Sequence, residues 1–417
     1  MTRPVVVFED QGYVNLQPLT YTRPACRLRC GIVTLWEKVA AAYPSAPVVL
    51  HTRDYVAGAV AEELQGVKVN ELTGDSALLI NGRLIASAAL AGAIPLEGDD
   101  CAYVCDGQVV AARVSGGKCV ELARLIGSGP LPDGWAGGLK TESVELPLVT
   151  YPWDLVSHNG KQIAADFDRM KVGGKIAGKV HESAVLDGKE HIHVAEGAEI
   201  QPGAILMAHE GPIFIGPGSK VMAGAVLEGP ISLGRKVTIK ILAKIYEGTS
   251  FGDYCKCGGE VEESIFQAYS NKQHDGFLGH AYLGEWINLG ADTNNSDLKN
   301  NYSNVAVMIN GRKVDSGSMF VGLIMGDHSK AGINTMFNTG TVVGVGCNVY
   351  GADFPPKYVP SYCWGGAGGF MEYDLDRCLA TAGKVMGRRD RELTPAGRAM
   401  LETVYKLTVD ERKAVVK

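Results

Sequence analysis

An asparagine-rich stretch in the second half of the sequence contains residue types that could bind a phosphate group. Residues 294–302 read Asn-Asn-Ser-Asp-Leu-Lys-Asn-Asn-Tyr, which brings the donors of Asn295, Lys299 and Asn300 close together along the chain. Ammonium and amide donors suit the oxygens of a phosphate. The same stretch could equally form a protruding turn or a contact between subunits.

Three arginines near the N-terminus, Arg23, Arg27 and Arg29, form a second group of candidate phosphate ligands. A guanidinium presents a planar fork of donors that matches the geometry of a phosphate. Salt bridges at the surface or at an interface are an equally good expectation for these side chains. Both groups therefore predict contacts to a substrate anion without excluding structural roles.

A zinc centre is a weaker alternative. It would need three histidines converging across a subunit interface, and His274, His280 and His328 are the candidates, although no spacing fixes their geometry. The ten cysteines never combine into paired C-x-x-C motifs, and their closest pairs are Cys26/Cys30, Cys101/Cys105 and Cys255/Cys257. We therefore expect reduced thiols in the core.

Composition and charge narrow the classes of partner. The chain has 417 residues, of which 46% are hydrophobic and 21% charged, so it should fold into two or three domains. Its net charge of −6 gives no basic field for nucleic acid or an anionic membrane, so we expect small-molecule and protein partners. No secretion signal opens the chain, and no stretch approaches the ~18 apolar residues of a membrane span. We expect a cytoplasmic protein.

The elements that position the candidate residues follow from a sequence period of six, which fits neither an α-helix nor an isolated strand. Three such six-residue sides make one coil of a triangular parallel β-helix, with the aliphatic side chain pointing inward. We expect this solenoid over roughly residues 178–352. An aliphatic residue followed by a small or polar one recurs at Val194, Ile200, Leu206, Ile215, Val221, Leu227, Leu233, Ile239, Ile245 and Phe251, and the pattern returns at Leu278, Leu283, Leu289, Met325, Ala331, Phe337 and Val343.

Other segments define three expected domains. Residues 1 to about 150 alternate short apolar runs with longer mixed segments, which indicates an α/β domain with a mainly parallel sheet, and we expect this domain to extend to residue 177. Glycine and proline over residues 115–140 predict a loop. The β-helix domain covers residues 178–354 and ends at Pro355-Pro356. In the extension 355–417, Thr394-Pro395 predicts the start of a helix that runs to about Val415.

Residues 274–293 resemble the acetyltransferase half of the GlmU-like family, the bifunctional glucosamine-1-phosphate acetyltransferases and N-acetylglucosamine-1-phosphate uridyltransferases. They read His-Asp-Gly-Phe-Leu-Gly-His-Ala-Tyr-Leu-Gly-Glu-Trp-Ile-Asn-Leu-Gly-Ala-Asp-Thr, and the alignment needs no gap. The resemblance implies a left-handed β-helix of hexapeptide repeats, acetyl-CoA as acyl donor and a homotrimer. It implies His274 as the general base and Asn288 as a contact to acceptor and acyl group. Phe277 replaces a family tyrosine that binds the sugar phosphate.

The same resemblance places the coenzyme A site approximately at Asn338, Thr339 and Gly340. It also implies that acceptor sites lie between neighbouring β-helices, so that no single chain completes one. A histidine suits the role of base because its pKa near ~6.5 lets it accept a proton at neutral pH. A structural histidine on a solenoid loop is the alternative for His274.

The N-terminal residues resemble the family's nucleotidyltransferase half, which has a Rossmann-like α/β fold, and more closely a sugar-nucleotidyltransferase-like subgroup fused to hexapeptide repeats. The likeness is carried by residues 18–38, by Leu79-Ile-Asn-Gly-Arg and by residues 152–159. Three positions depart from it: Asn15 replaces the arginine of the G-x-G-T-R loop, Ala25 a lysine, and Arg83 the magnesium-binding aspartate. A guanidinium cannot ligate Mg²⁺, and losing metal and cations should remove most of the rate of phosphoryl transfer.

Substitute ligands are Asp10, Asp106 and Asp154, which could hold Mg²⁺ if the site is active and could otherwise serve as turn or cap residues. The leading hypothesis is acetyl-CoA-dependent acyl transfer to an amino sugar phosphate or nucleotide sugar. The first alternative is a sugar-1-phosphate nucleotidyltransferase with a modified site. The second is an inactive scaffold that binds a nucleotide sugar.

Overall fold

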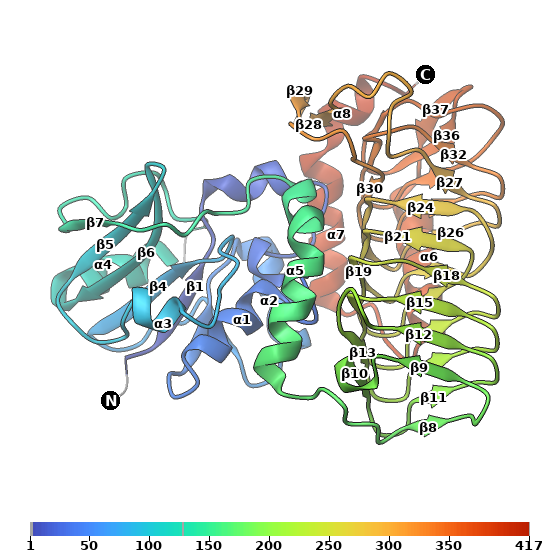
Figure 1. The fold of residues 1–417 in the computed structure, drawn as a ribbon. Coiled ribbons are helices and arrows are strands. Elements are labelled where there is room, and N and C mark those ends of the chain that lie inside the picture. The colour runs from blue at the N-terminus through green and yellow to red at the C-terminus, as the bar shows by residue number, and fades with distance from the viewer. Residues whose placement is uncertain (1–2, 127–128, 417) are drawn as a thin grey trace.

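The N-terminal domain is built on a seven-stranded sheet. The computed structural model describes residues 3–126 and 129–416, and Figure 1 shows this domain beside a tall stack of strands. The sheet order is β3-β2-β1-β4-β6-β5-β7, and only β6 runs antiparallel to its neighbours. The strands are β1 (Val5–Phe8), β2 (Val48–Leu50), β3 (Lys68–Val69), β4 (Ser76–Asn81), β5 (Cys101–Cys105), β6 (Gln108–Ser115) and β7 (Thr141–Ser143), and the helices are α1 (Leu35–Ala42), α2 (Asp54–Glu63), α3 (Leu90–Ala93) and α4 (Gly116–Ile126).

Helix α4 corrects the prediction of a loop over residues 115–140. The glycines that suggested a loop stand at the start of the helix, where Gly116 takes a left-handed φ of 53°. Behind them Cys119, Leu122 and Ile126 follow helical spacing and are buried against the sheet. Burial of this apolar stripe therefore outweighs the local turn signal.

Helix α5 (Pro152–Met170) lies between the two halves of the molecule, as the green helix in Figure 1. Asp154 accepts from the backbone of Thr150 and Tyr151 at the helix start, which makes it a cap residue. Asn159 bridges the halves, because its side-chain oxygen accepts from Gly31 N at 2.7 Å and its nitrogen donates to Gly248 O at 2.7 Å. The bridge fixes the N-terminal domain against the strand stack.

The strand stack is a left-handed parallel β-helix, as the sixfold period predicted. Its nine-strand face faces α5 and consists of β10 (Ile192–Val194), β13 (Ile213–Ile215), β16 (Ile231–Leu233), β19 (Thr249–Phe251), β22 (Ile265–Ala268), β25 (Tyr282–Glu285), β30 (Ile324–Met325), β33 (Val342–Val343) and β35 (Tyr358–Val359).

The eleven-strand face consists of β8 (Lys179–Val180), β11 (Glu199–Ile200), β14 (Lys220–Val221), β17 (Thr238–Ile239), β20 (Lys256–Cys257), β23 (Asn271–Lys272), β26 (Asn288–Leu289), β31 (Lys330–Ala331), β34 (Asn348–Val349), β36 (Cys363–Gly366) and β37 (Gly369–Glu372). The six-strand face consists of β9 (Val185–Asp187), β12 (Ile205–Met207), β15 (Val226–Glu228), β18 (Lys244–Ile245), β21 (Glu260–Glu262) and β24 (Phe277–Gly279), and β27 (Asn294–Asn295) with β32 (Met336–Phe337) continues beyond it. The aliphatic residues of the period fill the interior as one buried cluster.

The β-helix continues past Pro355-Pro356, where the sequence predicted its end. Tyr358 pairs with Val342 and Trp364 pairs with Asn348, so β35 and β36 add a further coil. The prolines lie in the loop before β35, where no ladder hydrogen bond requires an N–H donor.

An arm of residues 299–318 leaves the β-helix between β27 and β30. It contains the antiparallel hairpin of β28 (Ala306–Ile309) and β29 (Arg312–Asp315). Val305 and Val307 of the arm share a buried cluster with Leu16 and Leu19 of the N-terminal domain. The arm thereby ties the far end of the β-helix to the short helix at residues 11–16.

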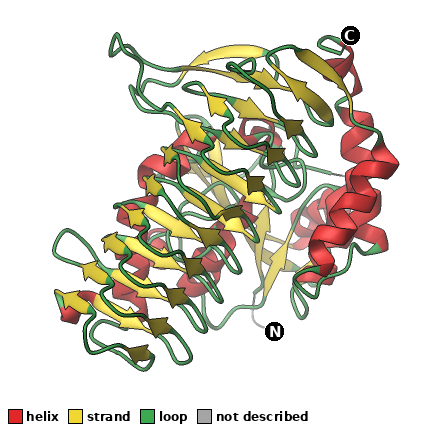
Figure 2. Ribbon diagram, turned by 90° about the vertical axis from the view of Figure 1, so that its right-hand side faces the viewer, coloured by secondary structure: helices red, strands yellow, loops and turns green. Residues whose placement is uncertain are grey.

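The C-terminal extension forms three helices, α6 (Leu375–Gly387), α7 (Pro395–Leu407) and α8 (Val409–Lys413). Thr394 caps α7 by accepting from Gly397 N at 3.1 Å, as its position before proline predicted. The predicted single helix to Val415 is wrong, since α7 ends at Leu407 and α8 follows. Figure 2 shows these helices beside the β-helix, and no helix in the described part of the chain is long and apolar enough to cross a bilayer.

Candidate functional site

Three edges separate the faces of the β-helix, and the three candidate histidines occupy one each. His274 lies where the eleven-strand face turns into the six-strand face, His280 where the six-strand face turns into the nine-strand face, and His328 where the nine-strand face turns into the eleven-strand face. They therefore do not converge within one chain. We name each edge after its histidine.

The His274 edge carries both residues expected to catalyse acyl transfer. β26 stacks on β23 with Asn288 paired to Asn271, so Asn288 lies on the coil next to that of His274. Both side chains are exposed to solvent. The geometry places a candidate base and an amide on one exposed surface of the β-helix.

Lys272 holds the backbone at this edge. It occupies an inward position that aliphatic residues fill in other coils, and 1% of it is exposed. Its Nζ donates to His274 O at 2.9 Å and to Gly258 O at 3.0 Å. Burial lowers the pKa of Lys272. An ammonium placed inside an apolar core is costly, so two backbone acceptors at the corner indicate a specific role in shaping it.

Four cations gather beside Asn271 and Asn288 on the eleven-strand face, and we call Lys240, Lys256, Arg388 and Arg389 the basic cluster. Arg389 donates from Nη2 to the side-chain oxygen of Asn271 at 3.2 Å. Burial lowers the pKa of Lys256, and the charges of Arg389, Lys240 and Arg388 lower it further. None of the four forms an ion pair with a carboxylate of residues 3–126 or 129–416. Unpaired cations beside a candidate base suit a phosphorylated substrate.

Asn295 and Lys299 bind their own chain instead of pointing to an open surface. Asn295 is buried and accepts from Gly279 N and donates to Gly279 O, both at 2.9 Å. Lys299 donates to Ser303 Oγ at 3.3 Å and to Asn304 O. Phe277 is partly buried in β24, and its backbone N–H donates to the side-chain oxygen of Asn294.

Residues Asn338, Thr339 and Gly340, expected near coenzyme A, lie beneath the arm. An added Cβ at Gly340 would meet Val305 at 2.7 Å and Val307 at 3.2 Å. Lys357 donates to Thr339 Oγ1 at 3.0 Å. The arm therefore covers this turn, and an acyl donor would reach it only if the arm moved.

At the expected nucleotide loop, Arg83 fills the space beside Gly12. Its guanidinium binds both oxygens of Asp10, at 2.8 and 2.6 Å, and an added Cβ at Gly12 would meet it at 2.4 Å. Asn15 lies in the short helix that follows Asp10. Ala25 is buried, and its backbone N–H donates to the carboxylate of Glu9. The other suggested metal ligands lie elsewhere: Asp154 caps α5, and Asp106 is exposed in the β5–β6 turn. These residues do not fit Mg²⁺, because the carboxylate nearest to the loop is neutralised by an arginine.

The three N-terminal arginines line a cleft of about 910 Å³ between the N-terminal domain, the His328 edge and helices α6 and α7. Arg23 is buried and makes two hydrogen bonds to Asp327, at 3.0 and 2.5 Å. Arg27 pairs with Glu63, and Arg29 binds the carbonyl of Ile32. Arg23 is therefore a bridge between domains and offers no free fork to a phosphate.

Glu285 and a ladder of stacked rings form the β-helix wall of this cleft. Tyr269, Trp286 and His328 stack along the edge, with 4.2 Å between the Tyr269 and Trp286 centroids. Burial raises the pKa of Glu285 to about 7, the charges of Glu63 and Asp327 add to the rise, and Arg23 opposes it. A carboxyl group that titrates near neutral pH in a cleft is a typical feature of a binding site.

Comparison with known proteins finds relatives named as nucleotidyl and acetyl transferases. Residues 5–174 match the family model described as sugar nucleotidyl transferase. The bifunctional protein GlmU of Methanocaldococcus jannaschii is 28% identical over 225 residues, 54% of this chain and 44% of the relative. The bifunctional sugar-1-phosphate nucleotidylyltransferase/acetyltransferase of Sulfurisphaera tokodaii is 29% identical over 199 residues, 48% of this chain and 43% of the relative. The resemblance to GlmU-like proteins is thus confirmed, although the chain spans less than half the length of these relatives.

Solved structures with similar folds include an acyltransferase that acts on UDP-N-acetylglucosamine. The UDP-N-acetylglucosamine acyltransferase from Campylobacter jejuni matches with 15% identity and a TM-score of 0.32, over 54% of this chain and 95% of that one. LpxA from Acinetobacter baumannii matches with 12% identity and a TM-score of 0.29, over 58% of this chain and all of that one. These scores are too low to carry an argument about substrate.

Proposed function

We propose that this chain, a relative of the sugar nucleotidyl transferase family over residues 5–174, transfers an acyl group from acetyl-CoA to the amine of a sugar phosphate or nucleotide sugar. His274 accepts the proton of the amine as nitrogen attacks the thioester carbon. The tetrahedral intermediate then expels the coenzyme A thiolate, which takes up a proton. Asn288 orients acceptor and acyl group through its amide.

One observation carries this proposal: His274 and Asn288 lie exposed on adjacent coils beside the unpaired basic cluster. The cluster supplies the charge that a phosphorylated acceptor or donor needs, and Lys272 fixes the corner that bears the base. Arg388 and Arg389 come from the loop after α6, so the C-terminal extension contributes to the site.

The exposed surface leads us to propose a homotrimer in which a neighbouring chain completes the site. Exposed apolar side chains follow the same His274 edge at Ile241, Leu242, Ile333 and Tyr350. A row of exposed apolar residues is typical of a protein interface. In this proposal residues 1–177 form the nucleotidyltransferase-like domain, 178–354 the acyltransferase-like domain and 355–417 the extension.

A second candidate is binding of a nucleotide sugar without turnover by the N-terminal half. It is favoured by the pair Arg83–Asp10, which occupies the nucleotide loop and leaves no carboxylate for Mg²⁺. The cleft at the His328 edge is a place, separate from the nucleotide loop, where a nucleotide sugar could bind. Nucleotidyl transfer is the weakest of the three hypotheses on this geometry.

The test is thiol release from acetyl-CoA with glucosamine 1-phosphate and with amino-sugar nucleotides as acceptors. We expect turnover that is lost in His274→Ala and kept in His209→Ala, a matched exposed histidine that pairs with Asp187. Pyrophosphate release from a nucleoside triphosphate and a sugar 1-phosphate is measured in parallel. Acyl transfer that survives His274→Ala, or pyrophosphate release without acyl transfer, contradicts the proposal.

A further inference from the structure

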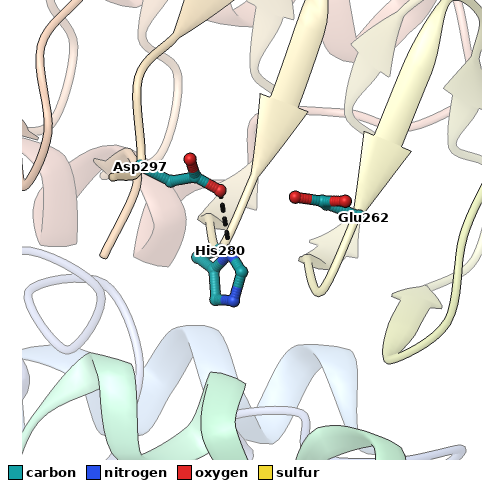
Figure 3. A group of neighbouring side chains, drawn as sticks. All are labelled: Glu262, His280 and Asp297. Carbon is teal, nitrogen blue, oxygen red and sulfur yellow. Dashed lines mark hydrogen bonds and ion pairs between the residues drawn. The ribbon is translucent and has the colours of Figure 1, made fainter. Parts of the chain in front are cut away.

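Three possible metal ligands converge on the His280 edge, away from the site described above. Glu262, His280 and Asp297 come from three successive coils, and Figure 3 shows their side chains turned toward one another. One ligand atom from each lies within 4.8 Å of the others. His280 Nδ1 and Asp297 Oδ2 are 2.8 Å apart.

Two carboxylates at this edge have no cationic partner among the described residues. Glu262 and the adjacent Glu263 are partly buried, and neither carboxylate has an ion pair or hydrogen bond to the described residues 3–126 and 129–416. Among the described residues His280 pairs with Asp297, and Glu262 and Glu263 add two further carboxylates at the same edge without a paired cation.

We propose that Glu262, His280 and Asp297 bind a divalent transition-metal ion of the Zn²⁺ or Mn²⁺ type. One imidazole nitrogen and two carboxylate oxygens form a donor set that such ions accept, with bonds of about 2.0–2.2 Å. The three ligand atoms lie within 4.8 Å of one another, so side-chain rotations must bring each of them to those distances from the ion. The ion replaces the hydrogen bond between His280 Nδ1 and Asp297 Oδ2: a neutral imidazole then carries its one proton on Nε2, and an imidazolium releases one proton to solvent.

The ion would act at the base of the arm. The carbonyl of Asp297 accepts from Val321 N at 3.0 Å, and Leu298 bridges to Phe320, so these residues close the loop from which the arm emerges. The ring of His280 stacks on Phe320 with centroids 4.9 Å apart. A bound ion therefore joins two coils of the β-helix to the root of the arm that packs on the N-terminal domain.

The test uses the full chain without a histidine tag, stripped with a chelator and titrated with ZnCl₂, MnCl₂ and CoCl₂ in calorimetry and absorption spectroscopy. We expect about one ion per chain, a cobalt spectrum of mixed nitrogen and oxygen ligation, and weaker binding as the pH falls. Glu262→Gln, His280→Gln and Asp297→Asn should each weaken binding by about tenfold or more. His209→Gln is the matched control, because His209 forms a 2.8 Å pair with Asp187 but is not part of the three-residue group.

A second readout separates lost binding from lost folding. Limited proteolysis within residues 299–318 should slow when the ion is added to the unaltered chain and stay unchanged in Glu262→Gln. Absence of stoichiometric binding in the unaltered chain, or binding that persists in all three variants or disappears in His209→Gln, would refute the site. None of these outcomes depends on acyl transfer, so the metal site and the proposed function fail separately.

Discussion

The pair Arg23–Asp327 should be the most sensitive point of the interface between the two halves. Arg23 belongs to the N-terminal domain and Asp327 to the His328 edge, and their side chains are 6% and 5% exposed. Asp327 also accepts from Thr22 Oγ1 at 2.7 Å and from Glu285 N at 2.8 Å. Asp327→Ala removes these acceptors and leaves the buried guanidinium with weaker contacts, a 3.5 Å ion pair to Glu285 and a 3.4 Å hydrogen bond to Leu19 O.

Removing one partner of a buried ion pair costs about 3–5 kcal/mol. An unfolding entropy of about 2.1 cal/mol/K per residue over 417 residues converts this cost to a fall in Tm of about 3–6 °C. The measurement is calorimetric unfolding of the full chain at pH 7.5. The double variant Arg23→Met with Asp327→Leu should recover most of the loss, because it removes both charges of this pair together.

The control is Arg398→Met, since Arg398 pairs with Glu402 on the surface of α7 and an exposed pair is worth about 0–1 kcal/mol. If Asp327→Ala and Arg398→Met shift Tm equally, the interface is not held by this pair. If the double variant is no more stable than Asp327→Ala, the cost is lost packing and not an unpaired charge.

Three further predictions follow from the site. Because burial raises the pKa of Glu285 in the folded chain, its ionisation should make folding less stable as the pH rises from about 4.5 towards neutrality, and Glu285→Gln should remove that slope in denaturant unfolding at several pH values. Arg389→Gln should raise the KM of the phosphorylated acceptor about 10- to 100-fold with kcat unchanged, the loss of one charge-assisted hydrogen bond, whereas Arg398→Gln should change neither parameter. Lys272→Met should lower kcat about tenfold or more at constant KM, because the corner that bears His274 loses its clamp, and equal changes in both parameters would instead indicate a general loss of fold.

The β-helix was predictable because its signal is local and repeated. Each inward residue, such as Leu227 or Ile245, marks one side of a coil, and the same spacing recurs in many coils. Helix α4 and the coil after Pro355 were not predicted, because glycine and proline are strong local signals that burial overrode. Helix α6 has no comparable repeat, and its place was missed.

The candidate site was only half predictable, because sequence patterns report local signals and not contacts between distant residues. His274 and Asn288 stand within one motif, so a likeness to a family could point to both. Arg389 reaches Asn271 from 118 positions further along the chain, and no local pattern marks that contact. Asp297 and Glu262 were missed as ligands, because their approach to His280 depends on the stacking of successive coils.

Three arginine–carboxylate pairs around the expected nucleotide loop share a structural consequence. Arg83 binds Asp10 beside Gly12, and Arg53 binds the buried Glu9, whose other oxygen accepts from Ala25 N. Arg23 extends the series across the interface to Asp327. These pairs satisfy the carboxylates of the loop and join it to the β-helix, and breaking any one of them would leave a buried charge. A loop held in this way is rigid and neutral, which suits a wall of the cleft better than a centre for phosphoryl transfer, where mobile phosphates and metal ions must be accommodated.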